Sequence, residues 1–392
     1  MIRRSIPLAC LLVLAAACSK PEPQPSPAPS ADPGAKNAAT GDAGGTTTTA
    51  ATSPGGAAIK LDGVTRGDFN RLAAELALPL FWIDDANKNG AIEPSELAMY
   101  WGLVPGAAPG EYVDKGAFTA KAQEAIASIK QRMLTKPVDP PGIDDKERAR
   151  RIAVLKELAQ GRVTLVATDL SKASPEEKRF VGFVTKAAEL IEQLYAKQQG
   201  TDVLAAKVPT GDAASKTLFF RGQGPKCEAP LTQNDEACSA IPGLAKGKLS
   251  GLYPADMLTQ PKFCEALSKK DKQLVDPFTV VMAGGDAGKD ALRAVPYHEA
   301  YPEETKAIAG QLRGAANALG EQEPALKAYL LAAAQAFTDD KWWPADEAWA
   351  KMDAKNSRFY LRIAPDEVYS EPCSTKALFH VSFGLINKGS LE

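Results

Sequence analysis

Apolar residues recur at helical spacing along several stretches of this chain, and the stretch with the clearest boundaries begins at Ser174. A serine followed by a proline and, three residues after it, by Glu177 is typical of a helix N-terminus. Apolar residues then fall on one face of the predicted helix, which ends near Gly200. These residues are Phe180, Phe183, Val184, Ala187, Ile191 and Leu194. Similar patterns predict helices over 118–134, 144–158, 303–319 and 323–337, with Gly320 between the last two.

Strand patterns are fewer and shorter. Residues 278–282 and 292–295 are apolar runs on either side of the glycine-rich turn signal at 284–288, which predicts a hairpin. Apolar and polar residues alternate over 359–363 and again over 379–385, as they do in strands with one buried face. The sequence therefore predicts an α+β fold that is mainly helical and has a smaller antiparallel β portion.

The first residues have the features of an export signal. Arg3 and Arg4 precede an apolar run over 6–17, which is too short to span a bilayer and ends in three alanines. Cys18 follows directly, and the pattern resembles the lipobox of bacterial lipoproteins. We expect residues 1–17 to be removed and Cys18 to be acylated, so that lipid anchors the protein on the extracytoplasmic side of the cell envelope. The alternative is an ordinary secretory signal with a chance cysteine.

A low-complexity segment follows the signal. Residues 18–60 are rich in Pro, Ala, Gly and Thr and hold few large apolar side chains, so we expect a disordered linker. The formal net charge of the chain is −2, and 24% of its residues are charged. This balance argues against a nucleic-acid partner, which would require a basic face.

The cysteines indicate disulfides. Of the six in the sequence, Cys10 lies in the signal and Cys18 follows it. The other four are Cys227, Cys238, Cys264 and Cys373. An even number in an exported protein favours disulfides. Cys227 and Cys238 lie close together in a loop rich in Pro and Gly, which predicts a local bridge and leaves Cys264 to pair with Cys373. For the second pair, two buried free thiols are the alternative.

The strongest local motif is the segment 85–96, which matches the calcium-binding loop of an EF-hand at each diagnostic position. Gly90 allows the sharp turn in the middle of such a loop. The expected ligands are Asp85, Asn87, Asn89, the backbone carbonyl of Ala91, Glu93 through water, and Glu96 as the bidentate closing residue. Pro79 interrupts the helix that should precede the loop, and the sequence has no second loop of this kind. A loop kept only as a turn is the alternative.

The last third of the chain carries a family resemblance. Its short motifs are Gly251-Leu252-Tyr253-Pro254, Asp276-Pro277-Phe278, Pro296-Tyr297-His298-Glu299, Asp346-Glu347-Ala348-Trp349 and Arg362-Ile363-Ala364-Pro365-Asp366-Glu367-Val368-Tyr369. This succession resembles dipeptidyl peptidase III and its bacterial relatives, including the peptidase-like half of some plant Nudix proteins.

The resemblance implies a substrate-binding role for two residues. In that family a Gly-Pro-x-Glu-x-Tyr-like segment lines the substrate cleft, where the Glu holds the free amine of the peptide and the Tyr hydrogen-bonds the scissile carbonyl. By position these residues are Glu367 and Tyr369, and Ala364 replaces the usual glycine. The alternative is that Glu367 and Tyr369 only hold the end of a strand in place.

Together these features predict five consecutive regions. We expect a signal peptide over 1–17, a linker over 18–60, an EF-hand-like calcium module over 61–110, a helical region over 111–246, and a truncated dipeptidyl peptidase III-like α+β region over 247–392.

The function implied by the resemblance is left open by one missing motif. The family's zinc helices carry His-Glu-x-x-Gly-His, whereas this sequence has two histidines, His298 and His380, and lacks that motif. The loop over 85–96 makes calcium the expected cofactor. Zinc is expected only if a C-terminal catalytic half exists. One hypothesis is part of a zinc metallopeptidase-like lipoprotein; the other is a calcium-binding surface lipoprotein that binds peptides or protein partners without cleaving them. The sequence determines neither enzymatic activity nor oligomeric state.

Overall fold

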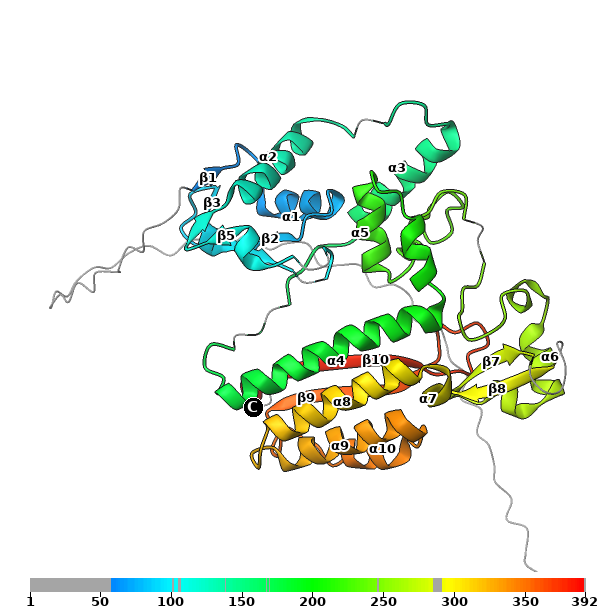
Figure 1. Cartoon of the computed structure of the whole chain (residues 1–392). Coiled ribbons are helices and arrows are strands. Elements are labelled where there is room, and N and C mark those ends of the chain that lie inside the picture. Colours follow the sequence, from blue (N-terminus) through cyan, green and yellow to red (C-terminus); the bar gives the residue numbers. More distant parts are fainter. Residues whose placement is uncertain are drawn as a thin grey trace, which may run out of the picture. The chain divides into compact units, whose positions relative to one another are not determined.

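The computed structural model describes residues 58–390 except 101, 105–106, 138, 167, 169, 245–246 and 285–290. The signal peptide, Cys18 and the linker up to residue 57 lie outside the described residues, so the expectations for them stay predictions. The described residues form helices and two-stranded antiparallel sheets (Figure 1), which confirms the predicted α+β class. In this part of the chain, no helix is both long and apolar enough to cross a bilayer.

The first apolar cluster lies within residues 59–134. Thr65 caps helix α1 by accepting a hydrogen bond from the backbone N–H of Asp68, at 3.1 Å, and Phe69 and Leu72 of this helix are buried in the cluster. Short strands pair as β1 with β3, β2 with β4 and β5 with β6. The bounds are β1 Ile59–Lys60, α1 Arg66–Glu75, β2 Leu80–Trp82, β3 Ala91–Ile92, β4 Leu97–Met99, β5 Val113–Asp114, β6 Ala117–Phe118 and α2 Ala120–Leu134. Strand β1 belongs to the region expected as linker.

A smaller cluster surrounds the disulfide between Cys227 and Cys238. Helices α3 (Asp145–Ala159) and α5 (Ala213–Arg221) pack together there. Asp144 caps α3 by accepting a hydrogen bond from the backbone N–H of Glu147 at 2.8 Å, which explains why the helix begins where the sequence predicts. The predicted local bridge between Cys227 and Cys238 is confirmed.

The largest apolar cluster is organised around helix α4 (Pro175–Gln199). Its N-terminus has the predicted capping box, because Ser174 accepts a hydrogen bond from the backbone N–H of Glu177 and the Glu177 side chain accepts one from Ser174. Gly200 ends the helix in the left-handed conformation with φ 67°. The predicted apolar face is buried except for Phe183, which is partly exposed.

Helix α8 (Pro302–Ala318) packs between α4 and α9 (Pro324–Asp339), as Figure 1 shows. Gly314 permits the close approach of α8 to α4, because a Cβ atom at this position would lie 2.6 Å from the Phe183 ring. The helices predicted over 303–319 and 323–337 are therefore confirmed, with ends that differ by one or two residues.

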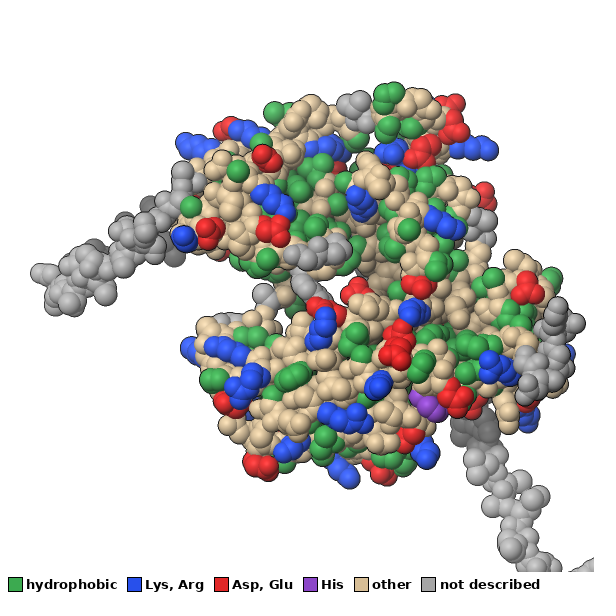
Figure 2. Space-filling view, viewed as in Figure 1, with side chains coloured by type: hydrophobic (Ala, Val, Ile, Leu, Met, Phe, Trp, Pro, Cys, Tyr) green, Lys and Arg blue, Asp and Glu red, His purple; other side chains and the backbone are tan. Residues whose placement is uncertain are grey.

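Two hairpins complete this cluster. Strand β9 (Phe359–Glu367) pairs with β10 (Leu378–Leu385), and β9 packs against α9 while β10 packs against α4. Strand β7 (Thr279–Ala283) pairs with β8 (Leu292–Pro296). The remaining helices are α6 Phe263–Lys270, α7 Tyr297–Ala300 and α10 Trp343–Trp349. A disulfide between Cys264 and Cys373 joins α6 to the β9–β10 connection, as predicted. On the face shown in Figure 2, acidic and basic side chains are interspersed.

Candidate functional site

A cavity of about 480 Å³ is lined by α4 and by the β9–β10 hairpin. Glu367 ends β9 and Tyr369 follows it, so the two residues implied by the family resemblance line the same cavity. His380 reaches the cavity from β10. The polar and charged lining residues are Glu192, Tyr195, Gln223, Glu367, Tyr369, Ser370 and His380.

The C-terminal end of α4 is attached to both sides of the hairpin. Gln199 donates hydrogen bonds from Nε2 to the hydroxyl of Tyr195, at 3.2 Å, and to the hydroxyl of Ser370, at 3.1 Å. The buried Gln198 accepts a hydrogen bond through Oε1 from the backbone N–H of Phe379 at 2.9 Å. These bonds hold the segment that carries Tyr369 against α4, so the cavity wall is anchored from both elements.

A β-bulge re-aims the side chains beside the cavity. The register of the hairpin shifts between Leu378 and Phe379, opposite Glu367, so pairing passes from Leu378 with Glu367 to Phe379 with Pro365. Such bulges bend a strand and redirect its side chains, often next to functional sites. The bulge therefore coincides with the point at which Glu367 enters the cavity lining.

Asp366, next to Glu367, contacts two basic side chains of the same hairpin. Asp366 accepts hydrogen bonds from Arg362 at 2.9 and 2.6 Å and is in ion-pair contact with Nε2 of His380. Burial raises the pKa of Asp366, but His380 and Arg362 outweigh it and hold this pKa below its usual value. Nδ1 of His380 lies 4.0 Å from Oε1 of Glu367.

The cavity is acidic and has an accessible hydroxyl. Glu192 and Glu367 are its lining carboxylates, and none of the described lining residues is Lys or Arg. Burial and the charge of Glu189 raise the pKa of Glu192. Tyr369 is 79% exposed, and the Glu367 carboxylate raises its pKa, so the phenol stays protonated at neutral pH. This arrangement can accept hydrogen bonds from an ammonium group and donate one from a hydroxyl.

The residues present do not match the family's zinc site. Within the described chain, two groups of three potential metal ligands lie within 4.8 Å of one another. One group contains Cys227 and Cys238, whose sulfurs are joined in a disulfide. The other consists of Asp366, Glu367 and His380, in which Asp366 is already bonded to Arg362. His298, the second histidine, contacts Asp340 through Nδ1 at 2.8 Å. We therefore derive no chemical step through zinc.

The loop over 85–96 makes the backbone turns that a calcium loop requires. Asp85 accepts hydrogen bonds from the backbone N–H groups of Asn89, at 3.0 Å, and Gly90, at 3.1 Å. Asn87 accepts one from the N–H of Asn89, and the Asn89 side chain accepts one from the N–H of Ala91. These bonds wrap the loop around its own side-chain oxygens, with Gly90 at φ 68°.

The elements that flank this loop differ from those of an EF-hand. Strands β2 and β4 stand where the two helices should be, because Leu80, Phe81 and Trp82 after Pro79 are buried as a strand and pair with residues 97–99. Strand β3 within the loop pairs with β1, which takes the place of a second hand. The loop therefore lies between paired strands, whereas the loop of an EF-hand lies between two helices.

Glu96, the expected closing ligand, is buried at the base of the loop. Its carboxylate accepts hydrogen bonds from the backbone N–H of Ala86, at 2.9 Å, from the indole N–H of Trp82, at 3.3 Å, and from the backbone N–H of Glu93, at 3.3 Å. Burial and the neighbouring Glu93 raise the pKa of Glu96. The other expected side-chain ligands, Asp85, Asn87, Asn89 and Glu93, lie in the same loop.

Sequence reasoning missed the α4 side of the cavity. Glu192, Tyr195 and Gln199 follow one another at spacings of three and four residues, which places them along one line of the helix. Their periodicity was available in the sequence, but only the apolar face of this helix carries a signal for burial. His380 was missed as well, because alternation assigns it only to a strand.

Comparisons with known proteins give partial matches. No family model matches the chain. The chain is 22% identical over 289 residues to Nudix hydrolase 3 of Arabidopsis thaliana, a match covering 60% of this chain and 37% of that protein. The structure of dipeptidyl peptidase III from Caldithrix abyssi matches with a TM-score of 0.51 and 23% identity, over 60% of this chain and 44% of the other. The structure of dipeptidyl peptidase III from Corallococcus sp. strain EGB matches with a TM-score of 0.49 and 26% identity, over 63% of this chain and 45% of the other.

These matches are partial. The chain spans less than half of the length of each of the three proteins. The likeness to the Caldithrix abyssi structure shows that this chain shares part of the dipeptidyl peptidase III fold.

Proposed function

We propose that this protein is a calcium-binding lipoprotein of the bacterial cell envelope whose dipeptidyl peptidase III-like cleft binds the free amino end of peptides. One observation carries the proposal: Glu367 and Tyr369 line a single cavity, together with Glu192 and without a lysine or arginine among its described lining. The fold shared with part of dipeptidyl peptidase III supports the peptide ligand.

We expect the residues of the cleft to contact two groups of the bound peptide, its terminal ammonium group and a peptide carbonyl. The Glu367 carboxylate would accept hydrogen bonds from the terminal ammonium group, and Glu192 of α4 adds a second carboxylate to the lining. The Tyr369 hydroxyl donates a hydrogen bond to a peptide carbonyl. A ligand that displaces water from the two carboxylates must compensate for their lost hydration. An ammonium group does so and a blocked, uncharged amine does not, so a peptide with a blocked amine should bind poorly.

The calcium and membrane parts of the proposal rest on the sequence. The oxygen-bearing residues of 85–96 follow the spacing of a calcium loop, and the loop turns described above are compatible with that role. Cys18 after an export signal supports the lipid anchor. The two disulfides are in line with an oxidising, extracytoplasmic compartment.

A calorimetric comparison of free and blocked peptides tests the cleft. We expect the purified protein to bind an unblocked tetrapeptide and its N-acetylated form to bind at least about tenfold more weakly, because charge-assisted hydrogen bonds are lost. Glu367→Gln should weaken the unblocked peptide by a similar factor. The matched control Glu321→Gln, whose side chain is 96% exposed and lies outside the cleft, should leave the affinity unchanged.

Two results would contradict the proposal. Equal affinity for free and acetylated peptides would show that the cleft does not hold the amine. Hydrolysis of a dipeptidyl substrate that disappears in Glu367→Gln would show a peptidase in place of a binding protein. We expect no hydrolysis even with added zinc, because the two histidines of this sequence do not form the family's zinc motif.

A further inference from the structure

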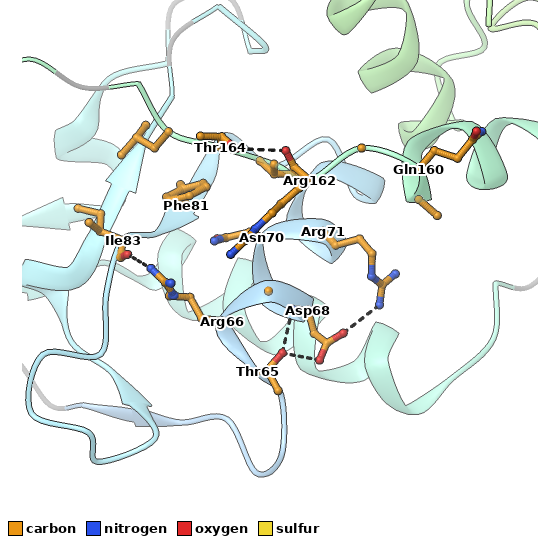
Figure 3. Close-up of a pocket in the computed structure, with 15 residues that line it drawn as sticks. Thr65, Arg66, Asp68, Asn70, Arg71, Phe81, Ile83, Gln160, Arg162 and Thr164 are labelled. Carbon is orange, nitrogen blue, oxygen red and sulfur yellow. Dashed lines mark hydrogen bonds and ion pairs between the residues drawn. The ribbon is translucent and has the colours of Figure 1, made fainter. Parts of the chain in front are cut away.

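A second cavity, of about 900 Å³, lies beside helix α1. The start of α1, strand β2 and the segment 159–165 after α3 line it, and Figure 3 shows the arginines of α1 and of that segment around the same space. It shares no lining residue with the cleft that contains Glu367. Its charged lining residues are Arg66, Asp68, Arg71 and Arg162.

Two of these arginines have no acidic partner among the described residues. Arg71 is neutralised, because its guanidinium lies 2.6 Å from Glu75 and 3.4 Å from Asp68. Arg66 donates a hydrogen bond only to the backbone carbonyl of Ile83, and Arg162 forms no ion pair within the described chain. The Asp68 carboxylate of the described lining contacts Arg71, so the guanidinium charges of Arg66 and Arg162 are left without an ion pair among the described residues. Two like charges at one cavity repel each other, and a bound anion would reduce this repulsion.

The remaining wall is rigid and partly apolar. Asn70 is buried. Its side-chain amide donates a hydrogen bond to the backbone carbonyl of Trp82, at 3.1 Å, and accepts one from the backbone N–H of Trp82, at 2.7 Å. Asn70 therefore joins α1 to β2 through both ends of its side-chain amide. Phe81, Ile83 and Val163 supply apolar surface around the arginines. A ligand for this cavity thus combines an acidic group with an apolar body.

We propose that this cavity binds a ligand with a carboxylate or phosphate group attached to an apolar body. Arg66 and Arg162 hold the acidic group, since a guanidinium offers paired N–H donors that match two oxygens of either anion. Phe81 and Ile83 contact the apolar part. This site is independent of the peptide cleft, because the two cavities share no lining residue.

Titration calorimetry with benzoate and phenyl phosphate, at low ionic strength, tests the site and distinguishes the two anions. We expect the purified protein to bind at least one of them, and added salt to weaken the binding. The double variant Arg66→Gln/Arg162→Gln should lose about tenfold or more in affinity. Arg162→Gln alone, which breaks no hydrogen bond of the described chain, should lose affinity without an effect on folding.

Arg179→Gln is the matched control, because Arg179 is an exposed arginine of α4 outside this cavity. Benzyl alcohol serves as the neutral probe and should not bind. Absence of binding by both anions would overturn the proposal. Equal loss of affinity in Arg179→Gln and in the double variant would also overturn it, because the effect would then follow net charge and not this cavity.

Discussion

Lys376 lies in an environment that is unusual for a lysine. Its side chain is fully buried, and Nζ donates hydrogen bonds to the carbonyl of Asp276, at 3.1 Å, and to the hydroxyl of Thr279, at 2.8 Å. The Tyr253 ring lies 5.7 Å from Nζ. Burial lowers the pKa of Lys376 from 10.5 to about 8, because a charged ammonium group loses its hydration there.

This lowered pKa makes folding stability depend on pH. Between pH 8 and 10.5 the unfolded chain binds a proton on Lys376 that the folded chain has lost, so stability rises with pH through this window. We expect the free energy of unfolding in urea to rise by roughly 2 kcal/mol between about pH 7.5 and 9.5. Lys376→Met should flatten the rise, whereas Lys306→Met, at an exposed position of α8, should retain it. An unchanged slope in Lys376→Met would refute this assignment.

Residue roles could be predicted only where a motif identifies them. Glu367 and Tyr369 could be found from the order of short motifs, and the structure places both at one cavity. Lys376 could not be found, because a lysine in a sequence indicates a solvent-exposed position, and only tertiary packing brings Asp276 and Thr279 to it. The place of Glu192 in the cavity lining could not be predicted either, because it depends on the same kind of tertiary packing.

At the scale of elements, helices with caps could be predicted and short strands could not. The start and end of α4 follow from Ser174 and Gly200, which act locally through the backbone. Strands β1 to β4 are two or three residues long, and their pairing depends on residues far away in the sequence. The residue spacing of the loop over 85–96 is visible in the sequence, whereas the strand pairing around it is not.

The loop over 85–96 leads to a prediction about thermal stability. We expect calcium to raise the unfolding midpoint, since at about a hundred times the dissociation constant linkage adds roughly 2.7 kcal/mol. Glu96→Gln should abolish most of this gain, and Asp114→Asn, in the neighbouring β5–β6 hairpin, should not. The gain should also fall as the solution is acidified, because the raised pKa of Glu96 means that its carboxylate takes up a proton early. A midpoint unaffected by calcium, or raised equally in Glu96→Gln, would refute a calcium site.

At the scale of the whole molecule, the shared fold covers only part of the chain. The likeness to dipeptidyl peptidase III extends over 60% of it, and the calcium-loop region belongs to a separate apolar cluster. The division into regions rests on composition and motif positions and stays a prediction. The cavities could not be predicted, because each is lined by elements distant in sequence, such as α4 and the β9–β10 hairpin.

The proposed lipid anchor leads to a prediction about where the protein is found in cells. Cys18→Ser should move the protein from the membrane fraction to the soluble fraction, because the acyl chains would be the attachment. Mass spectrometry of the N-terminal peptide should show acylation in the wild type alone. Unchanged fractionation together with an unmodified wild-type peptide would support a plain secretory signal.

A crystal structure with a bound unblocked tetrapeptide tests the central claim, amine recognition in the cleft, most directly. The distance to measure runs from the peptide's terminal nitrogen to the nearer Oε atom of Glu367. We expect about 2.8 Å, as in a charge-assisted hydrogen bond, with the Tyr369 hydroxyl within hydrogen-bonding distance of a peptide carbonyl. A peptide bound with its amine in solvent, or bound outside the cavity lined by Glu192 and Glu367, would contradict the account.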